Sequence, residues 1–412
     1  MMKKLMVLGA GEAQLQIIKE ALDSGYYTIV CDMRPELEGS RIASRYYQVD
    51  YTNRDAVLQI ATSECIDGIT SNSEAAMVNV AWVSEKLNLP GNPESAIKVL
   101  LSKTKFRELQ EKMGIFCPRH IVVENVEEAI DAVKTVGFPL IVKPVLSSGS
   151  RGTTVINSFD DDLIRGAFSS CAHYSRNGKV SIEQYVDMSS LVAYDAEIFV
   201  CNGQILWDGL YASIRSADAP MLPIMESLPL LVDDVGLQKI KFAVEKLIRE
   251  SGIRLGEYNA ETYFTKDGEC FVIEINPRQA GNHIPDLVFD HSGVNFTKLL
   301  CTTAVGDNEY LYNVIGLDRK NKPVTMYVVY SEHEGLYKGL KIDQSIEKNV
   351  VWTENLIEIG STANRKNNAG DAIAFVRMEF DSVEQQGEIT ERISEYIIPI
   401  IEENDRKQKM EA

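Results

Sequence analysis

The chain contains 412 residues, 45% of them hydrophobic, which is enough for two or three domains with apolar cores. Its 42 basic and 60 acidic residues give a net charge of −18 without a basic run that could follow a phosphate backbone, so we expect no nucleic-acid partner. No apolar stretch reaches the roughly 18 residues of a membrane span, and no cleavable signal precedes the first predicted strand, so a cytoplasmic protein without membrane contact is expected. The seven cysteines are scattered singly, which argues against disulfides and a zinc site.

The N-terminal residues alternate between apolar strands and helical patterns. Residues 5–9 form an apolar run that turns through Gly9-Ala10-Gly11 into a helix, and residues 27–31 form the next strand. This βαβ opening predicts a Rossmann-like α/β domain with a parallel sheet over residues 1–95. Gln14 stands where a dinucleotide-binding fingerprint has its third glycine, so we discount an NAD-dependent dehydrogenase.

After the break at Pro90-Gly91-Asn92-Pro93, the pattern changes to two α+β lobes over residues 96–314. The predicted elements are strands 121–123, 140–143, 154–156 and 180–186 with helices 126–136 and 161–168 in the first lobe, and strands 193–201, 204–211, 256–265 and 269–275 with helix 236–251 in the second. Residues 315–412 resemble a small β-rich domain that ends in a helix. No tandem repeat or low-complexity segment is present.

A hairpin in the second lobe concentrates oxygen ligands. Strand alternation puts Glu274 and Asn276 on the same face of one strand, and the neighbouring antiparallel strand brings Glu261 alongside them. Two carboxylates and an amide oxygen suit Mg²⁺, with Mn²⁺ as an alternative, and Mg²⁺ completes its coordination with water and phosphate oxygens. The pattern therefore predicts a divalent-metal site that serves a nucleotide.

The segment Ile273-Glu274-Ile275-Asn276-Pro277-Arg278, preceded by Asn259-Ala260-Glu261, resembles the metal-ligand signature of the ATP-grasp superfamily. Further landmarks follow the family's order. Ile141-Val142-Lys143-Pro144 resembles the strand whose lysine contacts the nucleotide phosphates, and residues 147–152 resemble the glycine-rich loop after it. Lys105 resembles the earlier phosphate-contacting lysine. The resemblance spans most of residues 1–310 and implies an ATP-grasp fold, with a Rossmann-like pre-ATP-grasp domain and a C-terminal β-rich domain, that uses Mg·ATP.

The resemblance also assigns the nucleotide site. A glycine-rich turn exposes backbone N–H groups to anions and a lysine adds a mobile charge, which agrees with phosphate binding. Residues 182–187 resemble the hinge that holds adenine, where Glu183 accepts from the adenine amino group or supports the hinge. The family's ribose-binding acid is missing a few residues on, so Asp187 is taken as its substitute. The expected nucleotide-binding residues are Lys105, Lys143, Ser148, Gly149, Ser150, Arg151, Gly152, Glu183, Gln184, Tyr185, Val186 and Asp187.

Arg278 is the expected catalytic residue, because a fixed guanidinium near the transferred phosphoryl group can stabilise developing charge. The expected substrate pocket lies beyond it, where Gly281 permits close backbone approach and His283 could act as a base. Glu74 follows a strand of the N-terminal sheet, at the edge where open α/β sheets bind ligands. Arg215 lies in a polar segment and could bind a substrate carboxylate; a solvated surface charge is the alternative.

These features predict an ATP-dependent carboxylate–amine ligase that forms an amide or peptide bond through an acyl phosphate and releases ADP and phosphate. The layout is similar to L-amino acid (dipeptide) ligases, to ATP-grasp enzymes of purine synthesis and, more distantly, to biotin carboxylases, and we prefer an amino acid ligase. A non-catalytic nucleotide-binding paralogue is disfavoured because all three proposed metal ligands are present. The expected partners are small-molecule carboxylates and amines, and a homodimer is left open.

Overall fold

A computed structural model describes residues 2–146, 152–187, 190–219 and 222–402. The first unit is a parallel sheet of strand order β3-β2-β1-β4. Its central strand is buried on both faces, with Leu5 and Val7 packed on the side of α1, and Met6 and Leu8 on the side of α3 and α4. The predicted Rossmann-like arrangement is confirmed. The elements are β1 (Lys4–Leu8), α1 (Glu12–Asp23), β2 (Tyr27–Asp32), α2 (Glu38–Ile42), β3 (Arg45–Gln48), α3 (Arg54–Glu64), β4 (Gly68–Thr70) and α4 (Glu74–Leu87).

The tight turn after β1 depends on a glycine with positive φ and on a hydrogen bond from the turn to the end of β2. Gly9 has a φ of +95°, and a Cβ at this position would lie 3.0 Å from the buried Gln14 side chain. Asp32, at the end of β2, accepts a hydrogen bond from the Ala10 N–H at 2.9 Å and pairs with Arg34 at 3.1 Å. Asp32 therefore fixes this turn.

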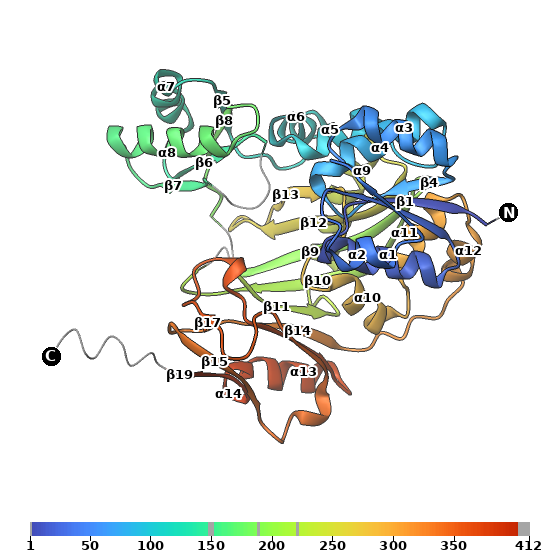
Figure 1. The fold of residues 1–412 in the computed structure, drawn as a ribbon. Helices are drawn as coiled ribbons and strands as arrows, with labels where there is room; N and C mark the ends of the chain where they lie inside the picture. The colour runs from blue at the N-terminus through green and yellow to red at the C-terminus, as the bar shows by residue number, and fades with distance from the viewer. Residues whose placement is uncertain (1, 147–151, 188–189, 220–221, 403–412) are drawn as a thin grey trace.

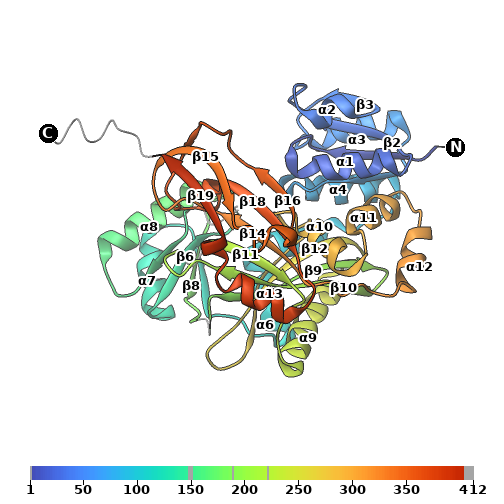
Figure 2. The ribbon, with the colours of Figure 1, turned by 90° about the horizontal axis from the view of Figure 1, so that it is seen from below.

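A separate lobe follows α5 and α6. Its four strands form an antiparallel sheet in the order β5-β8-β6-β7. The helices α7 and α8 cover the sheet and share an apolar core with it. Figures 1 and 2 both show this lobe and the N-terminal sheet on opposite sides of the central sheet. The elements are α5 (Glu94–Leu101), α6 (Lys103–Met113), β5 (His120–Val123), α7 (Val126–Val136), β6 (Leu140–Pro144), β7 (Thr154–Ile156), α8 (Asp161–Tyr174) and β8 (Val180–Gln184).

The central sheet has eight antiparallel strands in the order β13-β12-β9-β10-β11-β14-β18-β16. Its first five strands come from the predicted second lobe, although the short strand β11 was not expected from the sequence. The helix α9 lies between β11 and β12 in the chain, and it packs with α5 and α6 on one face of the sheet. The elements are β9 (Val192–Cys201), β10 (Gln204–Arg215), β11 (Pro223–Leu228), α9 (Asp234–Ser251), β12 (Leu255–Phe264) and β13 (Cys270–Asn276).

The C-terminal region continues the same sheet. Because β14 pairs directly with β11, hydrogen bonding runs across the predicted division between residues 314 and 315. The predicted terminal helix is wrong as an ending: two short helices are followed by β19, which pairs with β15 in a second, three-stranded sheet. The elements are α10 (Ile284–Ser292), α11 (Phe296–Ala304), α12 (Glu309–Ile315), β14 (Val324–Val329), β15 (Gly335–Ile342), β16 (Val350–Asn355), β17 (Thr362–Ala363), β18 (Ala374–Glu379), α13 (Val383–Thr390), α14 (Ile393–Tyr396) and β19 (Ile397–Glu402).

The two faces of the central sheet differ in polarity along β9 and β12. Ala196, Ile198 and Ala260 point to the face that packs against α5, α6 and α9. The alternate residues, including Glu197 and Glu261, point to the other face, since successive strand residues face opposite ways. This second face carries the acidic side chains discussed below. Within the described ranges, no helix combines the length and apolar composition that crossing a bilayer requires.

Candidate active site

Acidic and amide side chains lie in register across three strands of the central sheet. Asn259 of β12 pairs with Glu197 of β9 on one side and with Asn276 of β13 on the other. The next pair on the same face of β12 and β13 is Glu261 with Glu274. The hairpin therefore brings together the three side chains that the alternation pattern predicts would converge.

The Glu261–Glu274 pair has the electrostatics of a cation site. Burial raises the pKa of Glu261, and the neighbouring charge of Glu274 raises it further. Burial also acts to raise the pKa of Glu274, but Lys103, a 3.0 Å hydrogen bond from the Asn276 amide and the charge of Arg278 outweigh it and lower this pKa. Two neighbouring carboxylates with an amide form a hard oxygen donor set, which fits Mg²⁺.

Lys103, the first residue of α6, faces this acidic pair. Among the neighbouring charges, it contributes most to the lowered pKa of Glu274, and it also acts on the carboxylates of Glu261 and Glu74. Lys105 is exposed, and the structure does not bring it into this group. Two residues of helix separate them by about 200° around the axis, so only one can face the site. The structure therefore places Lys103, and not Lys105, beside the acidic pair.

Glu74 begins α4 and reaches the same group from the N-terminal unit. Burial raises its pKa first, and the charge of Glu274 raises it further, while Arg278, Lys103 and Arg176 oppose the shift. The sequence expectation placed Glu74 at the ligand-binding edge of the N-terminal sheet. The structure brings it electrostatically beside Glu274 and Arg278, so the N-terminal unit contributes a carboxyl group to the site.

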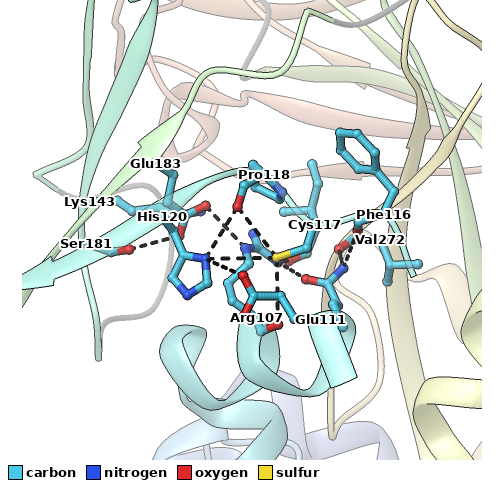
Figure 3. Close-up of polar contacts among 12 residues, drawn as sticks. Arg107, Glu111, Phe116, Cys117, Pro118, His120, Lys143, Ser181, Glu183 and Val272 are labelled. Carbon is cyan, nitrogen blue, oxygen red and sulfur yellow. Dashed lines mark hydrogen bonds and ion pairs between the residues drawn. The ribbon is translucent and has the colours of Figure 1, made fainter. Parts of the chain in front are cut away.

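Lys143 is held by a buried ion-pair network (Figure 3). Its Nζ lies 2.6 Å from Oε2 of Glu183, which also pairs with Nε of Arg107 at 3.2 Å and accepts from the Ser181 hydroxyl at 3.0 Å. Burial lowers the pKa of Lys143 to about 8 against the attraction of Glu183. The pKa of Glu183 falls to about 2 because Lys143 and Arg107 outweigh the opposing effect of burial.

The same network decides between the two roles expected for Glu183. Its carboxylate is only 1% exposed and is occupied by Lys143, Arg107 and Ser181. Arg107 in turn donates to the backbone carbonyl of Ile273, which precedes Glu274 in the acidic hairpin. Glu183 therefore supports the hinge and positions Lys143; the alternative, acceptance from an adenine amino group, is not favoured by this geometry.

A group of metal-ligand-type side chains lies next to this network (Figure 3). Nδ1 of His120 is 4.0 Å from Sγ of Cys117 and 3.7 Å from a carboxylate oxygen of Glu111. Burial raises the pKa of Cys117 to about 11, so the thiol is protonated at neutral pH. Because the thiolate is the form that binds metals, this group is a weaker metal site than the acidic pair.

The hinge segment joins the lobe to the central sheet after β8. The backbone N–H groups of Gln184 and Tyr185 donate to the carbonyls of Arg119 and Pro139, at 2.8 and 3.0 Å, so they fix the lobe. Val186 is buried. Asp187 is exposed and pairs with Lys266, which ties the hinge to the β12–β13 turn. A ribose-binding role for Asp187 requires that this surface pair opens.

Part of the predicted glycine-rich loop, including Ser148, Gly149, Ser150 and Arg151, lies outside the described residues. Gly152, where the description resumes, has a φ of +73°. A Cβ there would lie 2.8 Å from the ring of Tyr174, and its carbonyl accepts from Cys171 at 2.6 Å. The end of the loop is thus packed onto α8, and only glycine fits at this position.

A small cavity of about 40 Å³ lies between the N-terminal unit and the end of β13. Arg278, Gln279 and Glu257 line it together with Ser71 and Asn92. Glu257 accepts from the Gln279 amide at 2.9 Å, and its pKa is raised well above the usual range by burial and by the nearby carboxyl group of Glu197. Burial and mutual repulsion therefore disfavour the ionisation of both Glu197 and Glu257 beside this cavity.

Sequence comparisons identify relatives of this chain. Residues 102–200 match the family model described as the ATP binding domain of the carbamoyl-phosphate synthase L chain. The carbamoyl phosphate synthase large chain of Vibrio parahaemolyticus is 28% identical over 323 residues, which make up 74% of this chain but only 29% of that protein. A formate-dependent phosphoribosylglycinamide formyltransferase of Ignicoccus hospitalis is 27% identical over 282 residues, covering 67% of this chain and 69% of that protein.

Two solved structures superpose on nearly the whole chain. The L-amino acid ligase of Bacillus licheniformis has a TM-score of 0.79 at 19% identity and covers 97% of this chain and 99% of its own. The phosphoribosylglycinamide synthetase of Anaerococcus prevotii has a TM-score of 0.76 at 22% identity and covers 97% and 100%. The chain has the ATP-grasp fold. The predicted fold class is thereby confirmed, and the acidic hairpin lies in its central sheet.

The region beyond Arg278 differs from the expectation. A Cβ at the exposed Gly281 would meet no atom within 4 Å, so packing does not require glycine there. Both ring nitrogens of His283 are occupied, by Asp286 at 3.2 Å and by Glu354 at 3.1 Å, and the hydrogen bond with Asp286 is the largest cause of its raised pKa. His283 is therefore a linking residue to the C-terminal region rather than a ready base.

Sequence reasoning missed several charged residues in and around the acidic site. Asp195 and Glu197 share a face with Glu261 because β9 pairs with β12, and the period-2 alternation already predicted for residues 193–201 could have identified them. Glu226 was missed because β11 was not recognised as a strand. No single-sequence signal distinguishes Lys103 from Lys105, and the buried role of Arg107 depends on contacts with the hinge. The missed residues are Lys103, Arg107, Asp195, Glu197, Glu226 and Glu257.

Proposed function

We propose that this ATP-grasp chain is an ATP-dependent carboxylate–amine ligase that activates a carboxylate as an acyl phosphate and releases ADP and phosphate. The observation that carries the proposal is the paired Glu261 and Glu274 on one sheet face, with Lys103 and Arg278 acting on the same carboxylates. A structural surface would rarely gather two partly buried carboxylates with two cations. A phosphoryl-transfer site needs this combination of metal ligands and fixed positive charge.

Each residue has a distinct task in the proposed reaction. Glu261, Glu274 and Asn276 would hold Mg²⁺, which when bound neutralises the charge of the phosphate oxygens. Lys103 and Lys143 would bind the phosphates, and the Glu183–Arg107 network keeps Lys143 in place. Arg278 would orient the carboxylate and stabilise negative charge on the acyl group, first during phosphoryl transfer and then when the amine attacks.

Closure of the lobe over the phosphates would exclude water from the acyl phosphate. The lobe has its own sheet and core, so it can move as a unit about the segment that follows β8. The exposed pair between Asp187 and Lys266 spans this segment and is weak enough to open. Water exclusion favours attack by an amine over hydrolysis.

Within this class, we propose an amino acid as one substrate. The likeness to the L-amino acid ligase fold over 97% of the chain supports this choice. The similar fit of the phosphoribosylglycinamide synthetase keeps a purine-synthesis reaction as the second candidate, and biotin carboxylase folds, such as that of Campylobacter jejuni with a TM-score of 0.70, are the third. A small-molecule carboxylate and an amine are the substrates in the first two cases.

The test measures phosphate release from Mg·ATP with panels of amino acids, phosphoribosylamines and bicarbonate, followed by mass analysis of the products. We expect one carboxylate to raise phosphate release well above the ATP-only background. Glu274→Gln should lower that turnover by at least about 100-fold because it removes a charged metal ligand. Glu388→Gln, an exposed change on α13, is the matched control. Absence of stimulation by every carboxylate would contradict the ligase proposal.

A further inference from the structure

Two polar atoms that belong to oppositely charged side chains on the acidic face have no hydrogen-bond partner among the described residues. Nε of Arg215 and Oε2 of Glu226 are both buried without a hydrogen-bond partner. Glu226 is only 3% exposed. Leaving buried polar atoms of charged groups unsatisfied costs free energy, so such atoms call for an explanation, and a bound ligand is one.

Both residues belong to strands next to the metal-site hairpin. Glu226 of β11 pairs with Ser213 of β10, and Arg215 follows two residues later at an irregularity of the same ladder. The two side chains are close enough for each to shift the pKa of the other. Nevertheless, they do not form an ion pair, although a direct pair would satisfy both charges within the protein.

The neighbours of this pair hold each charge in place. The amide of Asn282, a residue with a φ of +53°, donates to Oε1 of Glu226 at 2.8 Å, which leaves the other carboxylate oxygen open. The phenol of Tyr330 lies near both charges, since Glu226 raises and Arg215 lowers its pKa, and its hydroxyl donates to the Pro223 carbonyl at 3.2 Å. The open oxygen of Glu226 is therefore fixed and desolvated before any ligand arrives.

Arg215 lies on the metal side of the pair. Its charge acts on Glu261, and the charges of Asp195 and Glu261 act on Arg215. An anion bound to Arg215 is consequently next to the proposed metal ligands, whereas a cation bound to Glu226 is displaced towards β14. The positions of Arg215 and Glu226 therefore fix the orientation of a bound molecule that carries both a negative and a positive charge.

We propose that Arg215 and Glu226 form a clamp for the carboxylate substrate of the ligase, and that this substrate is a zwitterion whose carboxylate contacts Arg215 and whose ammonium group contacts Glu226. The activated substrate is then an α-amino acid or a close relative with a cationic amine beside its carboxylate. Its ammonium group stays protonated on Glu226, so this amine does not attack, and a second amine makes the new bond.

The clamp rests on the proposed ligase function, and its test separates the two. Wild-type protein with Mg·ATP is assayed for phosphate release with individual amino acids and with their des-amino analogues, for example L-alanine against propionate. We expect kcat/KM to favour the best amino acid over its analogue at least about tenfold, which is the smaller end of the range for losing one hydrogen bond to a charged group. Glu226→Gln should remove most of this preference by lowering kcat/KM for the amino acid alone, with KM for ATP unchanged.

Arg215→Gln provides the complementary variant, because it should raise KM for the amino acid and for the analogue alike. Glu388→Gln, exposed on α13, is the control for the loss of one negative charge. Calorimetric binding of amino acids in the presence of Mg²⁺ and a non-hydrolysable ATP analogue gives a readout that does not depend on turnover.

Equal use of the amino acid and its analogue by the wild type, or an equal loss for both in Glu226→Gln, overturns the clamp while leaving the ligase proposal intact. If no carboxylate stimulates turnover and no amino acid binds, both proposals fail.

Discussion

At the scale of single residues, the proposed phosphate contact depends on which of two lysines faces the acidic pair. Lys103 and Lys105 are nearly adjacent in sequence, but α6 begins at Lys103 and directs it towards Glu274, whereas Lys105 is exposed. The family resemblance favoured Lys105, because a motif identifies a stretch of chain more reliably than the phase of its helix. The first residue of a helix is difficult to predict from sequence to within two positions.

This difference gives a direct prediction. Lys103→Ala should raise KM for ATP or lower kcat by at least about tenfold, since one charged contact to phosphate contributes roughly 1.5–3 kcal/mol. Lys105→Ala, the matched control two residues away, should change both constants by less than about twofold. Steady-state kinetics with ATP varied would measure this. A larger loss in Lys105→Ala than in Lys103→Ala would restore the assignment suggested by the resemblance.

Other residues of the site were predictable to different degrees. Glu261, Glu274 and Asn276 follow from alternation along one hairpin, and a hairpin is a local structure whose register depends on a short turn. Glu226 and Asn282 could not be predicted, because their proximity depends on a strand and a loop that are 56 positions apart. The two open charges of the clamp likewise appear only when β10 and β11 are paired.

At the scale of elements, one glycine is required by packing where the described part of the lobe resumes after the predicted glycine-rich loop. Gly152 has a φ of +73° and no room for a Cβ beside Tyr174, whereas a Cβ at Gly166, within α8 of the same lobe, would meet no atom within 4 Å. The sequence indicated a glycine-rich turn, but it could not say which glycine is required by packing and which is dispensable.

The two glycines therefore predict opposite effects in one lobe. Gly152→Ala should destabilise the protein by about 1 kcal/mol or more, from left-handed backbone strain and the clash, and should weaken ATP binding. Gly166→Ala should stabilise α8 by up to about 1 kcal/mol, since alanine has the higher helix propensity. Chemical denaturation and nucleotide titration would check both changes. A stabilised Gly152→Ala variant with normal ATP affinity would show that the loop end is not constrained in this way.

At the scale of the whole molecule, the central sheet joins two regions that the sequence suggested were separate. The strand pattern after residue 315 predicted a distinct β-rich domain, and the β-rich character is present. The pairing of β11 with β14 could not be foreseen, because β11 was not recognised and antiparallel partners distant in sequence leave no local signal. The C-terminal region is thus built onto the sheet that carries Glu226.

Gln386 of α13 contacts both β11 and β14, the two strands that join the C-terminal region to the rest of the central sheet. Its buried amide donates to the carbonyls of Leu228 and Val324 and to the hydroxyl of Thr325, at 3.1, 2.9 and 3.0 Å. The contacts join the ends of β11 and β14, so this one side chain spans both sides of the predicted division.

Gln386→Leu should lower the free energy of unfolding by about 1–3 kcal/mol, because it leaves buried carbonyl groups without a donor. Glu388→Leu, exposed two residues on, should have a much smaller effect. Denaturant unfolding followed by circular dichroism would compare them. Equal stability of the two variants would mean that water replaces the amide and that the junction is held by apolar packing alone.

The acidic face of the central sheet also limits how this protein can evolve. Burial raises the pKa of Glu197 and Glu226 to about 7, far above that of a free glutamate, so their ionised forms oppose folding at neutral pH. Neutral substitutions there should increase thermal tolerance and remove function. Selection for heat resistance alone would therefore replace these acidic residues first. Selection for catalysis would keep them and would favour stabilising substitutions at distant positions.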